Sequence, residues 1–388
     1  KVLKRDYENA ECLAEKALAG TPGQLQAAAA LCEVFFGTGR EQQANELTKK
    51  CIQHHPIQSI NHPGKSVPKV LLLQGIGVGS LGLSATGTVN EIDGHTNLAS
   101  VIAGDSLELI KVTVDALPKD IQLPCADIAV NVMAEPIVLN DALTCASKLL
   151  AGKLVTVINA PEKVAGLNRA LVAEKLREIP GLAVPVCYFV EGEGPEHRLA
   201  KALQLAKDGK LKFPLIVRPA GAHNGYYHLV TSPNEFVEQH FVSRVNAVYV
   251  TEFVDARLPD GLWRKTRGVV IGGIPMIEHH YISTHHCVNL SSSKAFALSH
   301  PWAEIESQKV IAEQCAKTLT ILAEIARILE LDFVAIDFVK CAKGRIVFFE
   351  ASPCVRWTLA SDLPVEGEYL REVIGDIRRW FTSLIANG

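Results

Sequence analysis

The sequence lacks several features that would place it at once in a common class. It has no run of about 18 uninterrupted apolar residues, so we expect no transmembrane helix and no membrane partner. It also lacks an excess of basic residues: the formal net charge is −3 and the pI is near 6.5, which argues against a nucleic-acid partner. Residues 1–6 carry no apolar stretch typical of a signal peptide, although a chain whose first residue is Lys leaves targeting at this end open.

The cysteines are not spaced as metal ligands or disulfide partners. None of the ten belongs to a CxxC pair. Several lie in apolar surroundings, where a reduced cysteine behaves as a small hydrophobic residue, so the pattern favours a cytoplasmic protein. A nucleophile elbow is missing as well, and no serine, histidine and aspartate occur in a context that supports nucleophilic catalysis.

What is present predicts a globular chain of several domains. With 388 residues, 48% of them hydrophobic, the chain is long enough for two or three domains. Changes of pattern divide it into a helical segment (1–60), an open α/β domain (68–158) and two α+β subdomains (159–250 and 251–388). The turn-rich stretch NHPGKSVP, residues 61–68, is expected to be a linker.

A repeat with a 34-residue offset occupies the helical segment. Residues 5–22 and 39–56 align so that Leu13 matches Leu47, and a proline ends each predicted helix. Between them, residues 24–36 form another predicted helix. This period resembles the tetratricopeptide repeat, whose helix pairs present a concave surface to a protein or peptide partner. An ordinary helical hairpin extension is the alternative.

The remaining chain shows two patterns of predicted secondary structure. Strands alternate with helices up to residue 161, which predicts an open sheet of parallel strands. The strands expected in this sheet are KVLLLQ, IKVTVDAL, ADIAVNVM and KLVTVINAP. From residue 159 onward, strands mostly follow one another, with long predicted helices over residues 161–178, 307–329 and 366–384.

A glycine-rich loop, QGIGVGSLG, follows the first of these strands. Its spacing is GxGxG rather than GxGxxG, and no helical pattern follows, so the sequence does not support a dinucleotide site. It predicts a turn at the edge of the sheet, where a ligand can approach the backbone. Asn131 and Glu135 stand at the end of another strand of this sheet and are candidate substrate contacts, with helix capping or a turn as the alternative.

The stretch LDFVAIDFVKCAKGRIVFFEASP places two carboxylates, Asp337 and Glu350, inside apolar strand-like runs. A buried carboxylate without compensation is costly or becomes neutral. The two runs predict a hairpin with Gly344 at a positive-φ loop position. If Lys340 pairs with Arg345, the two acids are diagonal neighbours roughly 7–8 Å apart on one face. They could then share a cation such as Mg²⁺. The alternative pairs each acid with a separate basic side chain or exposes it at the rim.

This hairpin resembles the metal-binding hairpin of the ATP-grasp superfamily, in which an Asp, a Glu and usually an Asn two residues later hold Mg²⁺ against ATP phosphates. Three further stretches are similar to family motifs in the expected order: 159–185 to the opening helix, 212–225 to the strand and lid loop, and 248–255 to the hinge. KTRGVVIGG is similar to the strand with a phosphate-facing arginine. The resemblance covers about residues 68–360 and implies an ATP-grasp fold preceded by its usual α/β domain.

The resemblance also implies the cofactors ATP and Mg²⁺ (or Mn²⁺) and the residues that bind them. The metal ligands would be Asp337, Glu350 and Ser352, where Ser352 replaces the usual Asn and puts the strength of that ligand in doubt. The ATP contacts would be Arg169, Arg218, His223, Asn224, Glu252, Phe253, Val254, Asp255 and Arg267. Arg218 stands where the family commonly has Lys; the charge persists, and arginine forks match phosphate oxygens.

Catalysis would fall to Arg267 and Arg356, which would meet the substrate carboxylate and the developing oxyanion; a surface ion pair is the alternative for Arg356. Two histidine pairs at 279–286 could suggest a metal site, but adjacent residues on a strand point to opposite faces. We therefore expect His280 and His286 to line the substrate side instead.

The expected activity is an ATP-dependent ligase that joins a carboxylate to an amine through an acyl phosphate. The substrates would be small molecules or peptides, and the helical repeats would bind a protein or peptide partner. The alternatives are a non-catalytic nucleotide-binding scaffold and a kinase on the same fold. A homodimer stays open, and variable loops leave both substrates unidentified.

Overall fold

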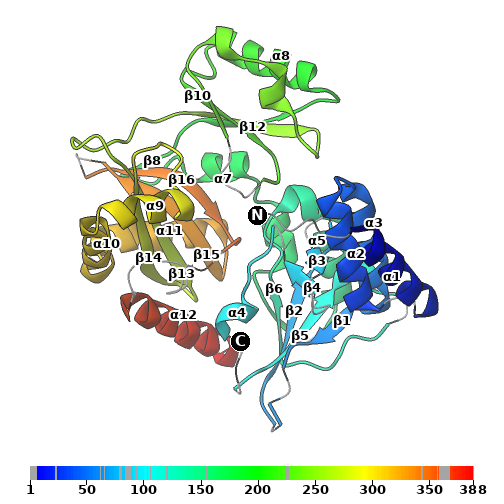
Figure 1. Ribbon diagram of the computed structural model, residues 1–388. Coiled ribbons are helices and arrows are strands. Elements are labelled where there is room, and N and C mark those ends of the chain that lie inside the picture. Colours follow the sequence, from blue (N-terminus) through cyan, green and yellow to red (C-terminus); the bar gives the residue numbers. More distant parts are fainter. Residues whose placement is uncertain are drawn as a thin grey trace.

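The computed structural model contains three larger sheets, each with helices beside it, and a separate two-stranded sheet (Figure 1). The described residues are 7–21, 24–61, 63–64, 66–77, 81–83, 89–91, 94–102, 104, 106–118, 121–153, 155–222, 227–341, 344–355, 357 and 368–387. An open, mostly parallel sheet is followed by two antiparallel sheets. This confirms the fold class that the sequence predicted.

Three helices begin the chain and pack side by side: α1 (Tyr7–Gly20), α2 (Leu25–Gly37) and α3 (Glu41–His54). Their shared core contains Leu31, Phe35 and the small residues Ala14 and Ala44. The helices lie where the sequence placed them, while the tetratricopeptide assignment stays a prediction. After α3 the chain forms β1 (Ile57–Ser59), which pairs antiparallel with the first sheet and lies within the segment expected to be helical.

The first sheet has the order β1-β5-β2-β6-β7, and all its strands except β1 are parallel. Its strands are β2 (Lys69–Gln74), β5 (Glu108–Thr113), β6 (Ile128–Asn131) and β7 (Thr156–Ile158). Its connections contain β3 (Leu81–Leu83), β4 (Val89–Glu91), α4 (Ala99–Ile102), a 3₁₀ turn (Val114–Ala116) and α5 (Pro136–Leu150), and α6 (Pro161–Ala165) follows its last strand. The parallel sheet therefore forms as the alternating pattern predicted.

The glycine-rich turn after β2 is shaped by close packing against α5. A Cβ on Gly75 would lie 2.3 Å from Cβ of Ala142. The following amides of Ile76 and Gly77 donate to the carboxylate of Asp115 at 2.9–3.1 Å. Gly75 thus allows close helix–strand contact, and Asp115, from the segment after the neighbouring strand, satisfies the next two amides of the turn.

This packing gives a stability prediction. We expect Gly75→Ala to lower the free energy of unfolding by about 1–3 kcal/mol, because the added methyl overpacks the interface. Ala142→Gly in the same chain should recover part of the loss, although glycine inside a helix costs about 1 kcal/mol by itself. Urea unfolding of both single variants and the double variant measures the coupling. Gly20→Ala, where nothing lies within 4 Å of the new Cβ, is the control; equal effects at both sites would contradict the packing explanation.

Residues 94–98 cross the carboxyl edge of the first sheet and connect it to the C-terminal part. Gly75 N–H donates to Nε2 of His95 at 3.1 Å, and Thr96 N–H donates to the carbonyl of Val132 at 2.8 Å. The Thr96 hydroxyl then donates to the carbonyl of Pro353 and accepts from Val355 N–H. One loop therefore holds the segment that follows the acidic hairpin.

The second sheet is antiparallel, has the order β11-β10-β12-β9, and encloses a separate core around Phe241. Its strands are β9 (Cys187–Glu191), β10 (Leu215–Pro219), β11 (His228–Val230) and β12 (Ala247–Glu252). The chain reaches it through α7 (Arg169–Leu176), and α8 (Pro195–Lys207) and 3₁₀ turns at Pro233–Glu235 and Glu238–Phe241 complete it. The predicted helix 161–178 is in fact α6 and α7, because the Asn168 side chain caps a new helix by accepting from the amides of Ala170 and Leu171.

The third sheet has the order β14-β13-β15-β16-β8, with only β8 parallel to its neighbour. Its strands are β8 (Leu182–Ala183), β13 (Trp263–Ile271), β14 (Ile274–Ser283), β15 (Phe333–Lys340) and β16 (Ile346–Ser352). The helices beside it are α9 (Leu290–Ser299), α10 (Trp302–Glu313), α11 (Ala316–Leu329) and α12 (Glu368–Asn387). The predicted helix 307–329 breaks at Gln314, which adopts a left-handed conformation.

The predicted register of the β15–β16 hairpin is wrong. Lys340 pairs with Ile346, and a bulge between Asp337 and Phe338 shifts the register again, so that Asp337 lies directly opposite Glu350. The two acids are therefore closer neighbours than the predicted diagonal pair. Gly344 does adopt the expected positive φ, +75°.

Two further observations concern the whole described chain. Of the helices in the described residues, none has both the length and the apolar composition that a membrane crossing requires. All ten cysteines are free thiols.

Candidate active site

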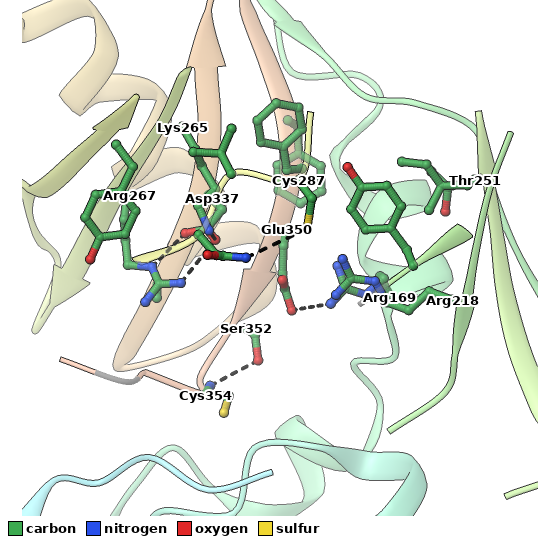
Figure 2. A pocket seen from close by; sticks show the side chains of 18 of the residues that line it. Arg169, Arg218, Thr251, Lys265, Arg267, Cys287, Asp337, Glu350, Ser352 and Cys354 are labelled. Atoms are coloured by element: carbon green, nitrogen blue, oxygen red, sulfur yellow. Dashed lines mark hydrogen bonds and ion pairs between the residues drawn. The ribbon is translucent and has the colours of Figure 1, made fainter. Parts of the chain in front are cut away.

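A cavity of about 680 Å³ lies between the second and third sheets. The second sheet contributes residues of β9, β10 and β12, the third contributes β13 to β16, and the loop carrying Gly94, His95 and Asn97 closes one side. Charged side chains from both sheets point toward one another across this space (Figure 2). Cavities of this size accommodate ligands as large as a nucleotide.

The floor of the cavity is a row of charged residues on adjacent strands. His279 on β14 pairs in register with Arg267 on β13, Arg267 pairs with Asp337 on β15, and Asp337 pairs with Glu350 on β16. Residues paired in this way share one face of a sheet. Arg169 of α7 meets the end of the row at Glu350 (Figure 2).

Asp337 is held by two cations. Arg267 donates through Nε to Oδ1 at 2.6 Å and through Nη2 to Oδ2 at 3.1 Å, and Lys265 Nζ lies 3.1 Å from Oδ2. Burial raises the pKa of Asp337, but the charges of Arg267 and Lys265 lower it more, so its pKa lies well below the ordinary value. This carboxylate is ionised at any physiological pH.

Glu350 is paired with Arg169, and a second guanidinium lies beside that pair. Arg169 Nη2 donates to Glu350 Oε1 at 2.5 Å. Arg218 forms no ion pair with any residue that the structure describes, and its guanidinium carbon is 5.6 Å from the ring centroid of Tyr227. Burial and the charge of Arg169 lower the pKa of Arg218 to about 10. Two neighbouring guanidiniums, of which only Arg169 is paired with a carboxylate of the described residues, form a site for an anion.

Aromatic side chains from both sheets also line the cavity and contact one another. Tyr227, which follows β10, and His286, which follows β14, meet through Oη and Nδ1 at 2.7 Å. His286 also contacts the rings of Phe253 and Trp263, at centroid distances of 5.9 and 6.1 Å. Glu252, Phe253 and Val254, for which the sequence predicted a hinge, also line the cavity, and the hinge role stays a prediction.

The residues present fit a small hard cation. Asp337 and Glu350 are directly opposed carboxylates that line the cavity, and Ser352 lies two residues further along the same face. Mg²⁺ is usually held by one or two carboxylates with the remaining positions filled by water and phosphate oxygens. Within the described residues, no group of three or more His, Cys, Asp or Glu could hold a metal by itself, so a cation bound here would need further ligands from a bound molecule or water.

Not all predicted site residues meet at the cavity. Those that line it are Arg169, Arg218, Glu252, Phe253, Val254, Arg267, His286, Asp337, Glu350 and Ser352. Three lie outside the described residues: His223, Asn224 and Arg356. The other four, Asp255, His280, Asn131 and Glu135, do not line the cavity.

Each of these four has other contacts. Asp255 is half exposed and pairs with Arg257. His280 faces away from the cavity, because it alternates with His279, and contacts the Thr266 hydroxyl at 2.7 Å.

Asn131 and Glu135, at the carboxyl end of β6, make contacts with neighbouring backbone. Asn131 is fully buried and donates to the carbonyl of Asn159. Glu135 caps α5 by accepting from the amide of Ile137 at 3.2 Å.

The sequence analysis assigned no role to many of the residues that line the cavity, among them His279, Lys265, Tyr227 and Asn97. His279 follows from the register with Arg267, and Lys265 follows from strand alternation, since it stands two residues before Arg267. Tyr227 and the loop residue Asn97 carried no such signal, because loops bring them to the cavity.

No protein-family model and no curated protein sequence matches this chain. Several solved structures are similar to it. A RimK-domain ATP-grasp protein from Sphaerobacter thermophilus is 16% identical, with 80% of this chain and 98% of that chain covered, at a TM-score of 0.43. The ATP-grasp ligase PsnB, complexed with a precursor peptide and AMPPNP, is 12% identical, with 83% and 99% covered, at 0.46. A carboxyaminoimidazole ribonucleotide synthase from Aspergillus clavatus, complexed with ATP, is 14% identical, with 75% and 71% covered, at 0.41. Because these TM-scores lie below 0.5, we base the function on the residues of the cavity.

Proposed function

We propose that this chain is an ATP-grasp enzyme that uses ATP and Mg²⁺ to join a carboxylate to an amine. The observation that carries the proposal is the juxtaposition of Arg169 and Arg218 with the opposed acids Asp337 and Glu350 in one cavity. Such a site offers cations to phosphate oxygens and carboxylates to a divalent ion. The motif resemblance supplies the same assignment for each of these residues.

The positions of the hinge residues and of the arginines suggest how the nucleotide would be oriented in the cavity. The base would lie at the hinge, Glu252 to Val254, and the phosphates would extend past Arg218 and Arg169 toward the two acids. Arg169 would exchange Glu350 for a phosphate, and Arg218 would gain the anionic partner that it lacks among the described residues. Asp337, Glu350 and Ser352 would hold Mg²⁺, which would supply positive charge to the phosphate oxygens.

The reaction needs little covalent chemistry from the protein. The acid's carboxylate oxygen attacks the γ-phosphorus, the bond to the bridging oxygen breaks, and ADP leaves with an acyl phosphate formed. The amine then attacks the acyl carbon, phosphate leaves with the bonding electrons, and the nitrogen loses a proton. Arg267, and Arg356 from outside the described residues, would stabilise charge on the acid. The helices α1 to α3 would bind a protein or peptide partner.

The test is to measure ADP release with Mg²⁺ and a panel of acids and amines, followed by mass spectrometry of the products. The ligase predicts ADP release that depends on an acid and an amide product that depends on both partners. A stable phosphorylated product without an amide would favour the kinase. Nucleotide binding without ADP release from any pair would favour the scaffold.

Arg218 gives a prediction that separates binding from stability. We expect Arg218→Met to weaken ATP binding about 10- to 100-fold, the effect of losing a charge-assisted hydrogen bond. The ligand-free variant should be at least as stable as the wild type, because a crowded guanidinium without an ion pair is removed. Fluorescent-nucleotide titration and thermal unfolding measure the two effects. Arg327→Met, which removes an exposed guanidinium paired with Glu324, is the control; a large loss of stability at Arg218 would show a structural role instead.

A further inference from the structure

Lys265 is a positively charged residue that lines the cavity, and the proposed function assigns no role to it. It stands on β13 two residues before Arg267 and points to the same face. Its side chain is 18% exposed, it lines the cavity, and its ammonium lies 3.1 Å from Oδ2 of Asp337 (Figure 2). Within the described part of the chain, Asp337 is its one charged partner.

The carboxylate of Asp337 does not need this ammonium. The Arg267 fork already reaches both of its oxygens, at 2.6 and 3.1 Å. An ammonium has three donors, and the ion pair with Asp337 uses one of them. Lys265 therefore has donors left for a ligand in the cavity.

Arg267 has a second source of compensation that Lys265 lacks. Glu278 occupies the irregular position in the β13–β14 pairing, is fully buried, and its charge acts on Arg267. If Asp337 turns to a divalent cation, as the proposed function requires, Arg267 keeps the charge of Glu278. Lys265 then loses its acidic partner and becomes an uncompensated ammonium facing the cavity.

Lys265 lies on the opposite side of the two acids from Arg169 and Arg218, the proposed phosphate contacts. In the row across the sheet, Arg267 and Lys265 flank Asp337 on one side, while Arg169 and Arg218 lie beyond Glu350 on the other (Figure 2). A γ-phosphate above the two acids would therefore have phosphate-binding arginines on one side and Lys265 on the other. The reacting acid has to approach from the side that the nucleotide leaves open.

We propose that Lys265 binds the reacting carboxylate of the acid substrate, on the side of Asp337 away from Arg169 and Arg218. This inference rests on the proposed function and adds a catalytic residue to it. The ammonium keeps its proton throughout; it holds the anion in place while the carboxylate oxygen forms its bond to phosphorus and the bond to ADP breaks. Tyr281, the cross-strand neighbour of Lys265, stacks on His279 at 3.9 Å and gives this side a flat wall.

The experiment is ligand-observed ¹⁹F NMR on the full chain saturated with AMPPNP and Mg²⁺, so that the phosphate positions are filled. The probes are 4-fluorobenzoate and 4-fluorophenylalanine, with 4-fluorobenzamide as the neutral match. We expect the wild type to bind the carboxylates and not the amide. Lys265→Met should weaken carboxylate binding about tenfold or more, Lys265→Arg should restore it, and the surface control Lys317→Met should change nothing. AMPPNP affinity should be unchanged in all three variants.

Three results would overturn the inference. One is equal binding of the carboxylates by Lys265→Met and wild type, and another is the absence of carboxylate binding by the wild type at millimolar concentration. The third is loss of AMPPNP binding in Lys265→Met, which would place the ammonium among the phosphate contacts. A wild-type chain that fails to bind AMPPNP contradicts the proposed function itself, and this is seen before any acid is added.

Discussion

Replacing Glu350 with glutamine is expected to abolish measurable ADP formation while leaving the melting temperature nearly unchanged. Glutamine keeps the shape of the side chain but removes the charge that would hold a divalent cation opposite Asp337. Losing one such electrostatic contact in an active site typically lowers the rate roughly 100- to 1000-fold. The Glu350 side chain is 26% exposed, against 8% for Asp337, and the amide oxygen of glutamine can still accept a hydrogen bond from Arg169, so the stability loss should be smaller than at Asp337.

The measurements are single-turnover ADP formation and thermal unfolding of the same preparations. Binding of ATP without metal should persist in Glu350→Gln, because Arg169 and Arg218 remain. Glu324→Gln is the matched control, since this acid forms a comparable pair with Arg327 on the surface. Ordinary ADP formation by Glu350→Gln would remove the metal hypothesis.

Replacing Asp337 with asparagine is expected to have the largest effect on stability. The side chain is 8% exposed and is the shared partner of Arg267 and Lys265, which are themselves only 17% and 18% exposed. Removing one member of a buried ion pair and leaving the cations uncompensated typically costs about 3–5 kcal/mol. Urea unfolding measures this, and Asp376→Asn, in an exposed pair with Arg379, should cost far less.

The same residue predicts a pH dependence. The pKa of Asp337 is lowered in the folded chain, so the unfolded chain binds more protons in acid. The stabilisation is complete above the pKa of an unfolded aspartate, about 3.9, and is lost as the pH falls below it. Wild type should therefore lose stability more steeply than Asp337→Asn below about pH 4. Parallel acid unfolding curves for the two chains would contradict the assigned ion pairs.

Much of the fold could be predicted from sequence because periodicity is local. The runs around β2, β5 and β6 and the apolar stripe of α11 depend on nearest neighbours along the chain. The helix breaks before α7 and at Gln314 could not be predicted, since a capping side chain and a single left-handed residue decide them. Strand β1 is too short to show alternation.

The candidate site was predictable where acids interrupt apolar strands, as at Asp337 and Glu350. The bulge that brings these acids directly opposite each other left no sequence signal, and it made the predicted register wrong. The sequence left open whether a metal ion or basic side chains balance the charge of the two carboxylates. In this structure Lys265 and Arg267 pair with Asp337, and Arg169 pairs with Glu350. The proposal therefore requires that bound nucleotide and metal replace these ion pairs.

A crystal structure of the chain grown with AMPPNP and Mg²⁺ tests this replacement most directly. We predict one metal ion between the carboxylates of Asp337 and Glu350, phosphate oxygens on Arg169 and Arg218, and the Arg169–Glu350 contact opened. A structure in which the nucleotide binds elsewhere, or in which both acids keep their present cations with no metal between them, would contradict the account.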